Sequence, residues 1–101
     1  YDLSLKVLLV DDMRTVRRLV TKALKEIGFI NIVDASDGAA AWRILAGADA
    51  HIGLIVCDWN MPNVNGIDFL KKVRSNVKFK KLPFFLLTVE SEHKQVIIKG
   101  E

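Results

Sequence analysis

Four short segments typical of strands, separated by longer segments with helical periodicity, constrain the fold of this chain most strongly. Residues 5–10, 54–57 and 83–87 are nearly continuous apolar runs, and residues 31–35 can form a further short strand. Short runs rich in branched apolar residues are typical of strands that are buried on both faces, as in a parallel sheet. Strands that alternate with helices in this way form right-handed βαβ units. The sequence therefore predicts an α/β fold, with a doubly wound parallel sheet of four strands.

The segment after the first run shows the clearest helical pattern. Its apolar residues recur at spacings of three and four, which puts them on one stripe of a helix: Val16, Leu19, Val20, Ala23, Leu24 and Ile27. Gly28 follows where a C-terminal cap is expected. Asp37 is expected to cap a second helix, and residues 67–73 belong to a third. We expect the tail from Glu90 to begin a fourth helix.

Length and composition favour one domain, covering residues 1–101. The 15 basic and 12 acidic residues give a net charge of +3, which is too small and too dispersed to indicate a nucleic-acid partner. The single cysteine, Cys57, excludes an internal disulfide and suits a reducing compartment. No apolar run approaches the roughly 20 residues of a membrane helix, and no signal peptide is recognisable. A cytoplasmic protein without membrane partners is expected.

Polar side chains follow three of the predicted strands. Asp11 and Asp12 follow the first strand, Asp58 follows the third, and Thr88 follows the fourth. Ligands of open α/β sheets bind beyond the carboxyl ends of the strands, so these side chains are expected to meet. Clustered carboxylates repel one another unless a cation binds between them. Hard oxygen ligands favour Mg²⁺, or Mn²⁺ in its place, so Asp11, Asp12 and Asp58 form a predicted metal site.

Phosphoryl transfer suits such a site, because this chemistry depends on positioning and on neutralising charge. A carboxylate beside a metal can attack phosphorus and become an acyl phosphate, which makes Asp58 the predicted phosphoacceptor. The hydroxyl of Thr88 is expected to hydrogen-bond the phosphoryl group. Taken alone, Asp12 is better explained as a helix N-cap and Thr88 as a strand-end hydroxyl. The joint pattern favours the functional interpretation.

With these residues in place, the sequence closely resembles the response-regulator receiver family, and its chemotaxis branch in particular. The resemblance covers almost the whole chain and depends on these segments: Val7-Leu8-Leu9-Val10-Asp11-Asp12, Ala35-Ser36-Asp37-Gly38, Asp58-Trp59-Asn60-Met61-Pro62-Asn63 and Thr88-Val89-Glu90. The segment that begins at Asp58 is the most specific of them. The resemblance implies a flavodoxin-like receiver fold and a two-component phosphorelay.

The resemblance also implies a role for each site residue. Asp58 would accept phosphate from a phosphohistidine on a sensor histidine kinase, or from a small phosphodonor. Asp12, Asp58 and the main-chain carbonyl of Asn60 would bind Mg²⁺, and Asp11 would hold a metal-bound water. Thr88 would move toward the phosphoryl group as part of the switch. Family members dephosphorylate themselves slowly, so no enzyme acting on an external substrate is implied. In the chemotaxis branch, the phosphorylated form binds the flagellar motor switch.

One departure from the family pattern concerns the C-terminal part. The family has a fifth parallel strand followed by a lysine, and then a last helix. This sequence reaches Glu101 within the expected fourth helix, and neither Lys94 nor Lys99 corresponds to that lysine. We therefore expect a receiver domain that is incomplete at its C-terminus. Its fourth strand, residues 83–88, would be an exposed apolar edge, which predicts self-association or exchange of elements between copies.

Two alternative functions are compatible with the residues. A Mg²⁺-dependent phosphatase of the haloacid dehalogenase type also uses an aspartate nucleophile at a strand end. Those enzymes need a second aspartate two residues further on as a general acid, and Asn60 occupies that position here. The other alternative is an inert receiver fragment that keeps the fold but no longer signals.

Overall fold

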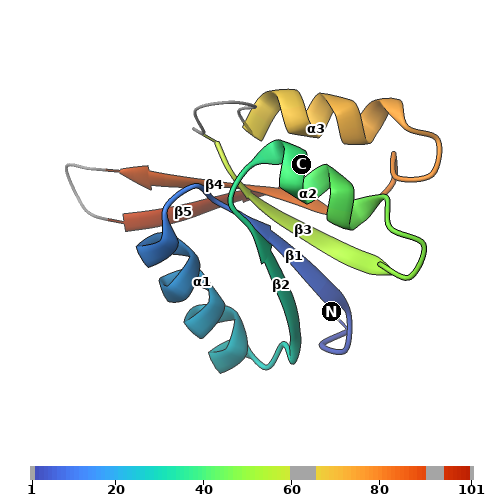
Figure 1. Cartoon of the computed structure of the whole chain (residues 1–101). Helices are drawn as coiled ribbons and strands as arrows, with labels where there is room; N and C mark the ends of the chain where they lie inside the picture. Colours follow the sequence, from blue (N-terminus) through green and yellow to red (C-terminus); the bar gives the residue numbers. More distant parts are fainter. Residues whose placement is uncertain (1, 60–65, 91–94, 101) are drawn as a thin grey trace.

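A computed structural model describes residues 2–59, 66–90 and 95–100 of the chain. The elements in chain order are β1 (Lys6–Val10), α1 (Arg14–Ile27), β2 (Asn31–Ala35), α2 (Gly38–Leu45), β3 (Ile52–Asp58), α3 (Gly66–Ser75), β4 (Phe84–Glu90) and β5 (Gln95–Gly100). The strands form one sheet in the order β2-β1-β3-β4-β5. Helix α1 covers one face of this sheet, whereas α2 and α3 cover the other (Figure 1).

The first four strands are parallel, as the sequence predicts. Strand β1 pairs with β2 on one side and with β3 on the other, and β3 pairs with β4. The last residue of β1, Val10, has Ala35 and Cys57 as its partners in the two neighbouring strands. The carboxyl ends of β1, β2 and β3 therefore lie at the same edge of the sheet, where a ligand site is expected.

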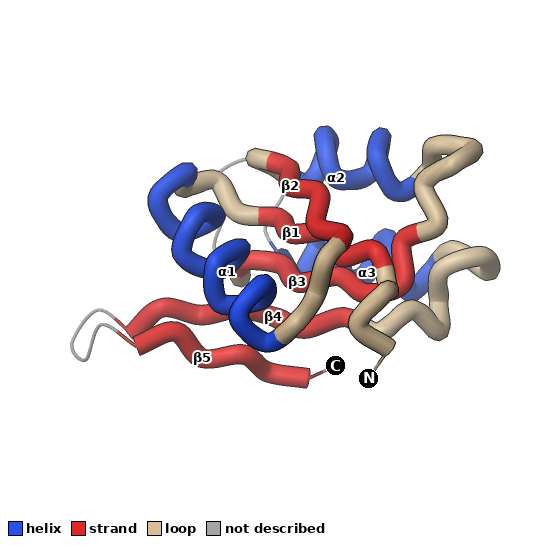
Figure 2. The backbone as a smooth tube through the Cα atoms, turned by 90° about the horizontal axis from the view of Figure 1, so that it is seen from below, coloured by secondary structure: helices blue, strands red, loops and turns tan. Residues whose placement is uncertain are grey.

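The central strands are apolar on both faces because helices cover both faces. In β1, Val7 and Leu9 pack in the cluster on the α1 side, whereas Leu8 and Val10 pack in the cluster on the α2 and α3 side. All four of these side chains have 0% of their surface exposed. Figure 2 shows α1 on the opposite side of the strands from α2 and α3. This double burial explains why the strands have apolar residues at consecutive positions.

Local signals in the sequence position the ends of two helices correctly. The carboxylate of Asp37 accepts a hydrogen bond of 2.7 Å from the backbone N–H of Ala40, which caps α2. Gly28 ends α1 with a positive φ of 124°, and its N–H donates to the carbonyls of Leu24 and Lys25. Within the described residues, no helix has the length and apolar character needed to cross a membrane.

The apolar stripe predicted on α1 is only partly buried. Val20 and Leu24 are buried against the sheet, but Leu19 and Ile27 are 59% and 65% exposed. In the described part of the chain, α1 is the one helix on its side of the sheet (Figure 1). The outer half of its apolar surface consequently has no neighbouring helix to pack against.

The predicted helix from Glu90 is wrong, and a strand replaces it. Strand β4 continues through Glu90, and β5 returns antiparallel to it, with Phe85 paired to Gly100 and Glu90 to Gln95. The physical reason is that an unpaired strand edge offers a row of N–H and C=O groups to any extended segment. Residues 95–100, with three consecutive branched apolar residues, have the composition of a strand.

This pairing also changes the expectation for the edge of the sheet. Strand β5 covers β4, so β4 is not the open edge from which self-association was predicted (Figure 2). The fold class otherwise agrees with the prediction of four parallel strands. Within the described residues, the parallel fifth strand of the receiver family is absent, and the fifth strand of this sheet is antiparallel.

A carboxylate site at the ends of β1 and β3

Three carboxylates meet where β1 and β3 end. Asp11 and Asp12 follow β1 directly, and Asp58 is the last residue of β3. Each residue offers one carboxylate oxygen, and these oxygens all lie within 4.8 Å of one another. The chain leaves β1 toward β2 on one side, whereas β3 lies on the other side, so the cluster is at the point where the strand order reverses. Ligand sites of open α/β sheets occur at this position.

Asp11 is the deepest of the three residues. It is 2% exposed, and it is the one buried charged or polar residue in the described part of the chain. Its backbone N–H donates to the carbonyl of Ala35 at 3.1 Å, which joins it to the end of β2. Its carboxylate accepts a hydrogen bond of 2.8 Å from the N–H of Met13, at the start of α1. The loop between β1 and α1 is therefore held by a backbone hydrogen bond to β2 and by a side-chain hydrogen bond to the start of α1.

Burial raises the pKa of Asp11 to about 6. Loss of water around the carboxylate is the main cause, and the negative charges of Asp58 and Asp12 raise the pKa further. The hydrogen bond from Met13 acts in the opposite direction, because it stabilises the charged form. Near neutral pH the three carboxylates are thus electrostatically unfavourable as they stand, and a bound cation would relieve this repulsion.

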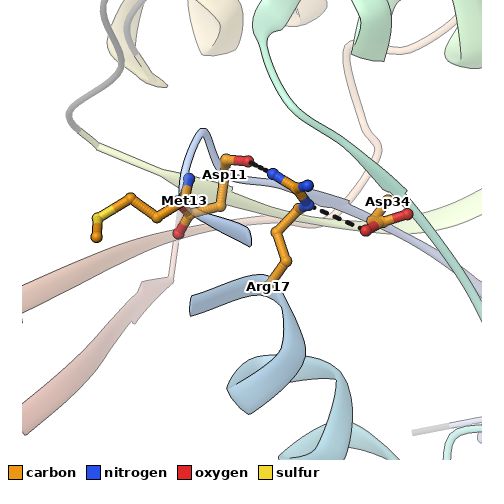
Figure 3. Close-up of polar contacts among 4 residues, drawn as sticks. All are labelled: Asp11, Met13, Arg17 and Asp34. Atoms are coloured by element: carbon orange, nitrogen blue, oxygen red, sulfur yellow. Dashed lines mark hydrogen bonds and ion pairs between the residues drawn. The ribbon is translucent and has the colours of Figure 1, made fainter. Parts of the chain in front are cut away.

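Arg17 connects the β1–α1 loop to β2. Its Nη1 atom donates to the main-chain carbonyl of Asp11 at 2.7 Å, and its Nε atom donates to a carboxylate oxygen of Asp34 at 3.0 Å (Figure 3). Arg17 is not among the predicted site residues, because in the sequence it lies off the apolar stripe of a helix and resembles any solvent-facing arginine. No local signal could have found the contact, since Asp34 lies on another element and Arg17 bonds a backbone atom.

Asp58 is partly buried, and the residue after it is held on two sides. The N–H of Trp59 donates to the carbonyl of Leu87 in β4 at 3.0 Å, and the carbonyl of Trp59 accepts from the N–H of Gly66 at 2.9 Å. A Cβ atom added at Gly66 would overlap the carbonyl oxygen of Asp58 and lie 2.9 Å from the Cα of Trp59. Gly66 therefore allows α3 to begin against the end of β3, a role that the sequence analysis did not assign.

The remaining predicted site residues have different outcomes. Asp12 is exposed, and it is not the N-cap of α1, because Met13 holds that position without a side-chain cap bond. Thr88 follows Leu87, whose Cα partner is Asp58, so its backbone lies beside the end of β3. The side chain of Thr88 and the whole of Asn60 lie outside the residues that the structure describes.

Cys57 belongs to the core. It is 0% exposed, and burial raises the pKa of its thiol. Its Sγ atom donates to the carbonyl of Asp58 at 3.3 Å. A buried thiol with a raised pKa is a poor nucleophile, so the chemistry of this edge belongs to the carboxylates.

The four parallel strands, with an acidic cluster at their carboxyl edge, agree with the receiver fold that the sequence resembles. A model of the response regulator receiver domain family matches residues 7–99. The chain belongs to this family, which makes it a receiver domain and supports a role as a two-component signalling switch.

The curated proteins similar to this chain include chemotaxis proteins. The chain is 40% identical over 93 residues to the chemotaxis protein CheY1 of Helicobacter pylori, covering 92% of this chain and 74% of that protein. It is 40% identical over 94 residues to CheY-3 of Vibrio cholerae, covering 93% of this chain and 71% of that protein.

Solved structures agree with the fold. The chemotaxis response regulator CheY4 of Vibrio cholerae matches with a TM-score of 0.75 and 35% identity, over 91% of this chain and 76% of that one. The phosphorylated form of the cyanobacterial phytochrome response regulator RcpA matches with a TM-score of 0.77 and 26% identity, over 87% of this chain and 67% of that one.

Proposed function

We propose that this chain is a phosphorylation switch that accepts a phosphoryl group on Asp58. The observation that carries the proposal is the cluster of three carboxylates at the ends of β1 and β3, with their oxygens within 4.8 Å of one another. One of the three, Asp11, is buried, so a binding partner is needed to offset the repulsion. Membership of the receiver family and the likeness to CheY proteins support the same assignment.

We propose Mg²⁺ as the resident cation, with Mn²⁺ as a substitute. The donor set fits, because it consists of carboxylate oxygens and contains no sulfur or imidazole ligand among the clustered residues. Asp12 and Asp58 would hold the ion, Asp11 would hold a metal-bound water, and the main-chain carbonyl of Asn60 would complete the set by resemblance to the family. The bound ion supplies positive charge that neutralises the incoming phosphoryl group.

The reaction at Asp58 balances as a simple displacement. A carboxylate oxygen of Asp58 attacks phosphorus and forms an O–P bond, while the P–N bond of a phosphohistidine breaks and the imidazole leaves with the electron pair and takes up a proton. With a small acyl phosphate as donor, the P–O bond breaks and a carboxylate leaves. The N–H of Trp59, bonded to Leu87, and the contact with Gly66 keep the end of β3 in place during this step. Thr88 would contact the phosphoryl group afterwards.

The decisive experiment is transfer from acetyl phosphate in the presence of Mg²⁺, followed by intact-mass measurement. We expect an increment of one phosphoryl group, which is lost in Asp58→Asn and in the presence of a chelator. Asp49→Asn is the matched control, because Asp49 is an exposed aspartate in the turn before β3. If the mass of the wild type does not increase, the chain is better explained as an inert fragment. If the mass increment persists in Asp58→Asn, another residue is the phosphoacceptor.

The proposal also separates a switch from an enzyme. A receiver domain would release its own phosphate slowly and would not turn over an added phosphate ester. Sustained hydrolysis of p-nitrophenyl phosphate would contradict this and would favour the phosphatase alternative.

For partners, we propose a sensor histidine kinase as the donor and a component of the flagellar motor switch as the target, within the cytoplasm. The support is that the similar curated proteins are named chemotaxis proteins. The measurement is binding of a purified motor-switch protein by calorimetry, with and without phosphorylation. Equal affinity for both forms would contradict the proposal.

A further inference from the structure

We propose that Arg17 is a positioning residue of the carboxylate site, because it fixes the peptide that joins Asp11 to Asp12. This inference rests on the proposed function to the extent that the site binds Mg²⁺. Arg17 lies in α1 and would not itself contact the ion. Its contribution is the orientation of the two aspartates that follow β1.

The Arg17 side chain hydrogen-bonds two separate segments of the chain, the β1–α1 loop and β2. The Arg17 side chain is 16% exposed, so its guanidinium is mostly enclosed, whereas the Asp34 side chain is 57% exposed. Two nitrogens of one planar group reach two different elements, at 2.7 Å to the carbonyl of Asp11 and at 3.0 Å to Asp34 in β2 (Figure 3). A lysine has a single ammonium group at the end of a flexible stem, so it cannot reproduce this fork.

The bond to the Asp11 carbonyl matters because that carbonyl belongs to the peptide before Asp12. A peptide unit is planar, so holding its oxygen fixes the orientation of the N–H and Cα of the next residue. The N–H and the carboxylate of Asp11 have their own partners, Ala35 and Met13. Asp12 is exposed, so core packing does not hold its side chain. The Arg17 bond is therefore a restraint on the backbone from which the Asp12 side chain extends.

The charge of Arg17 and its positioning role predict opposite effects on metal binding. Removing a cation close to three carboxylates would strengthen binding of Mg²⁺, because it removes a repulsion. Removing the restraint on the peptide would weaken binding, because a ligand is no longer held in the binding geometry. The sign of the change therefore distinguishes the two roles.

The test measures the affinity of the whole chain for Mg²⁺ by calorimetry at constant ionic strength. For Arg17→Ala we expect the affinity to fall by about 10-fold, the lower end of what loss of a supporting contact costs a metal site. Arg17→Lys keeps the charge and is expected to recover only part of that loss. Arg18→Ala is the matched control, since Arg18 is exposed and carries the same charge, and its side chain makes no hydrogen bond or ion pair within the described residues. It is expected to leave the affinity unchanged or slightly higher.

The inference is overturned if Arg17→Ala binds Mg²⁺ as tightly as the wild type or more tightly, or if Arg18→Ala weakens binding equally. It is also overturned if the wild type binds no Mg²⁺. A second readout needs no metal: amide hydrogen exchange at Met13 should accelerate in Arg17→Ala, while Leu8 in the core of β1 stays protected. Should Arg17→Ala not fold, Arg17→Lys decides, with reduced affinity in support and wild-type affinity against.

The outcome is separable from that of the proposed function. If acetyl phosphate leaves the wild type unmodified but Arg17→Ala still weakens Mg²⁺ binding, the positioning role stands and the switch function fails. If Asp58 is phosphorylated but Arg17→Ala and Arg18→Ala bind Mg²⁺ with equal affinity, the switch function stands and the positioning role fails.

Discussion

Replacing Asp11 with asparagine is expected to stabilise the metal-free protein at neutral and alkaline pH. The pKa of Asp11 is about 6 in the folded protein, compared with an ordinary value of 3.8. Each pH unit of difference corresponds to about 1.4 kcal/mol, so ionising this buried carboxyl reduces the free energy of unfolding by at most about 3 kcal/mol. Asparagine removes the charge, and its side-chain oxygen can still accept the hydrogen bond from Met13.

The direction of the pH dependence follows from the raised pKa. The folded protein binds the proton of Asp11 more tightly than the unfolded chain does, so the proton stabilises the fold. This stability is complete below pH 3.8 and is lost as the pH rises through about 6. Between pH 5 and pH 8, the wild type should lose about 1.4 kcal/mol relative to Asp11→Asn. Comparing the two proteins cancels the contributions of other groups that titrate in this range.

Urea unfolding of both proteins at pH 5 and pH 8, with a chelator present, measures the effect. Saturating Mg²⁺ should then stabilise the wild type at pH 8 and should stabilise Asp11→Asn much less, since the variant has lost a carboxylate from the site. The reasoning would be refuted if Asp11→Asn were less stable than the wild type at pH 8 without metal. It would also be refuted if the difference between the two proteins did not change with pH.

Three further predictions concern the apolar core, Gly66 and Cys57. Leu8→Ala, at a fully buried position of β1, should lower the free energy of unfolding by about 2–5 kcal/mol in urea titrations, whereas Leu19→Ala, which is 59% exposed, should change it by less than about 0.5 kcal/mol. Gly66→Ala should slow phosphorylation of Asp58 by acetyl phosphate and lower stability, because the added Cβ overlaps the Asp58 carbonyl; an unchanged rate in the mass assay would contradict this. Cys57 should react with Ellman's reagent at pH 8 only when urea unfolds the protein, and rapid labelling of the native protein would show that it is not buried.

The sequence predicts the sheet and the carboxylate cluster because both depend on short local patterns. Residues 7–10 and 54–57 are apolar at consecutive positions and rich in branched side chains, which is typical of strands covered on both faces. The ends of neighbouring parallel strands lie at the same edge, so Asp12 and Asp58 are brought together by topology before any side chain is considered. Each of these signals is contained in a short stretch of chain.

The features that the sequence did not predict depend on partners that are distant in the chain. In the sequence, Arg17 looks like any solvent-facing arginine. Its hydrogen bond to Asp34 can be predicted only when the register of β2 against β1 is known. The periodicity of α1 shows which side of the helix is apolar, but not how much of that side the sheet covers, so the exposure of Leu19 was missed. The segment 95–100 is too short for its apolar pattern to separate a helix from a strand, and pairing with β4 decides the outcome.

The antiparallel pairing of β4 and β5 has a consequence for the order of folding. Glu90 pairs with Gln95 across a short connection, whereas Leu8 must find Ile55 after a crossover that includes two helices. Hairpins close in roughly 1–10 μs, and pairings between distant segments are slower because loop closure costs entropy. We therefore expect the β4–β5 hairpin to form early. A strand segment with four consecutive apolar residues, 84–87, would then already have a backbone partner on one side while the parallel strands are still assembling.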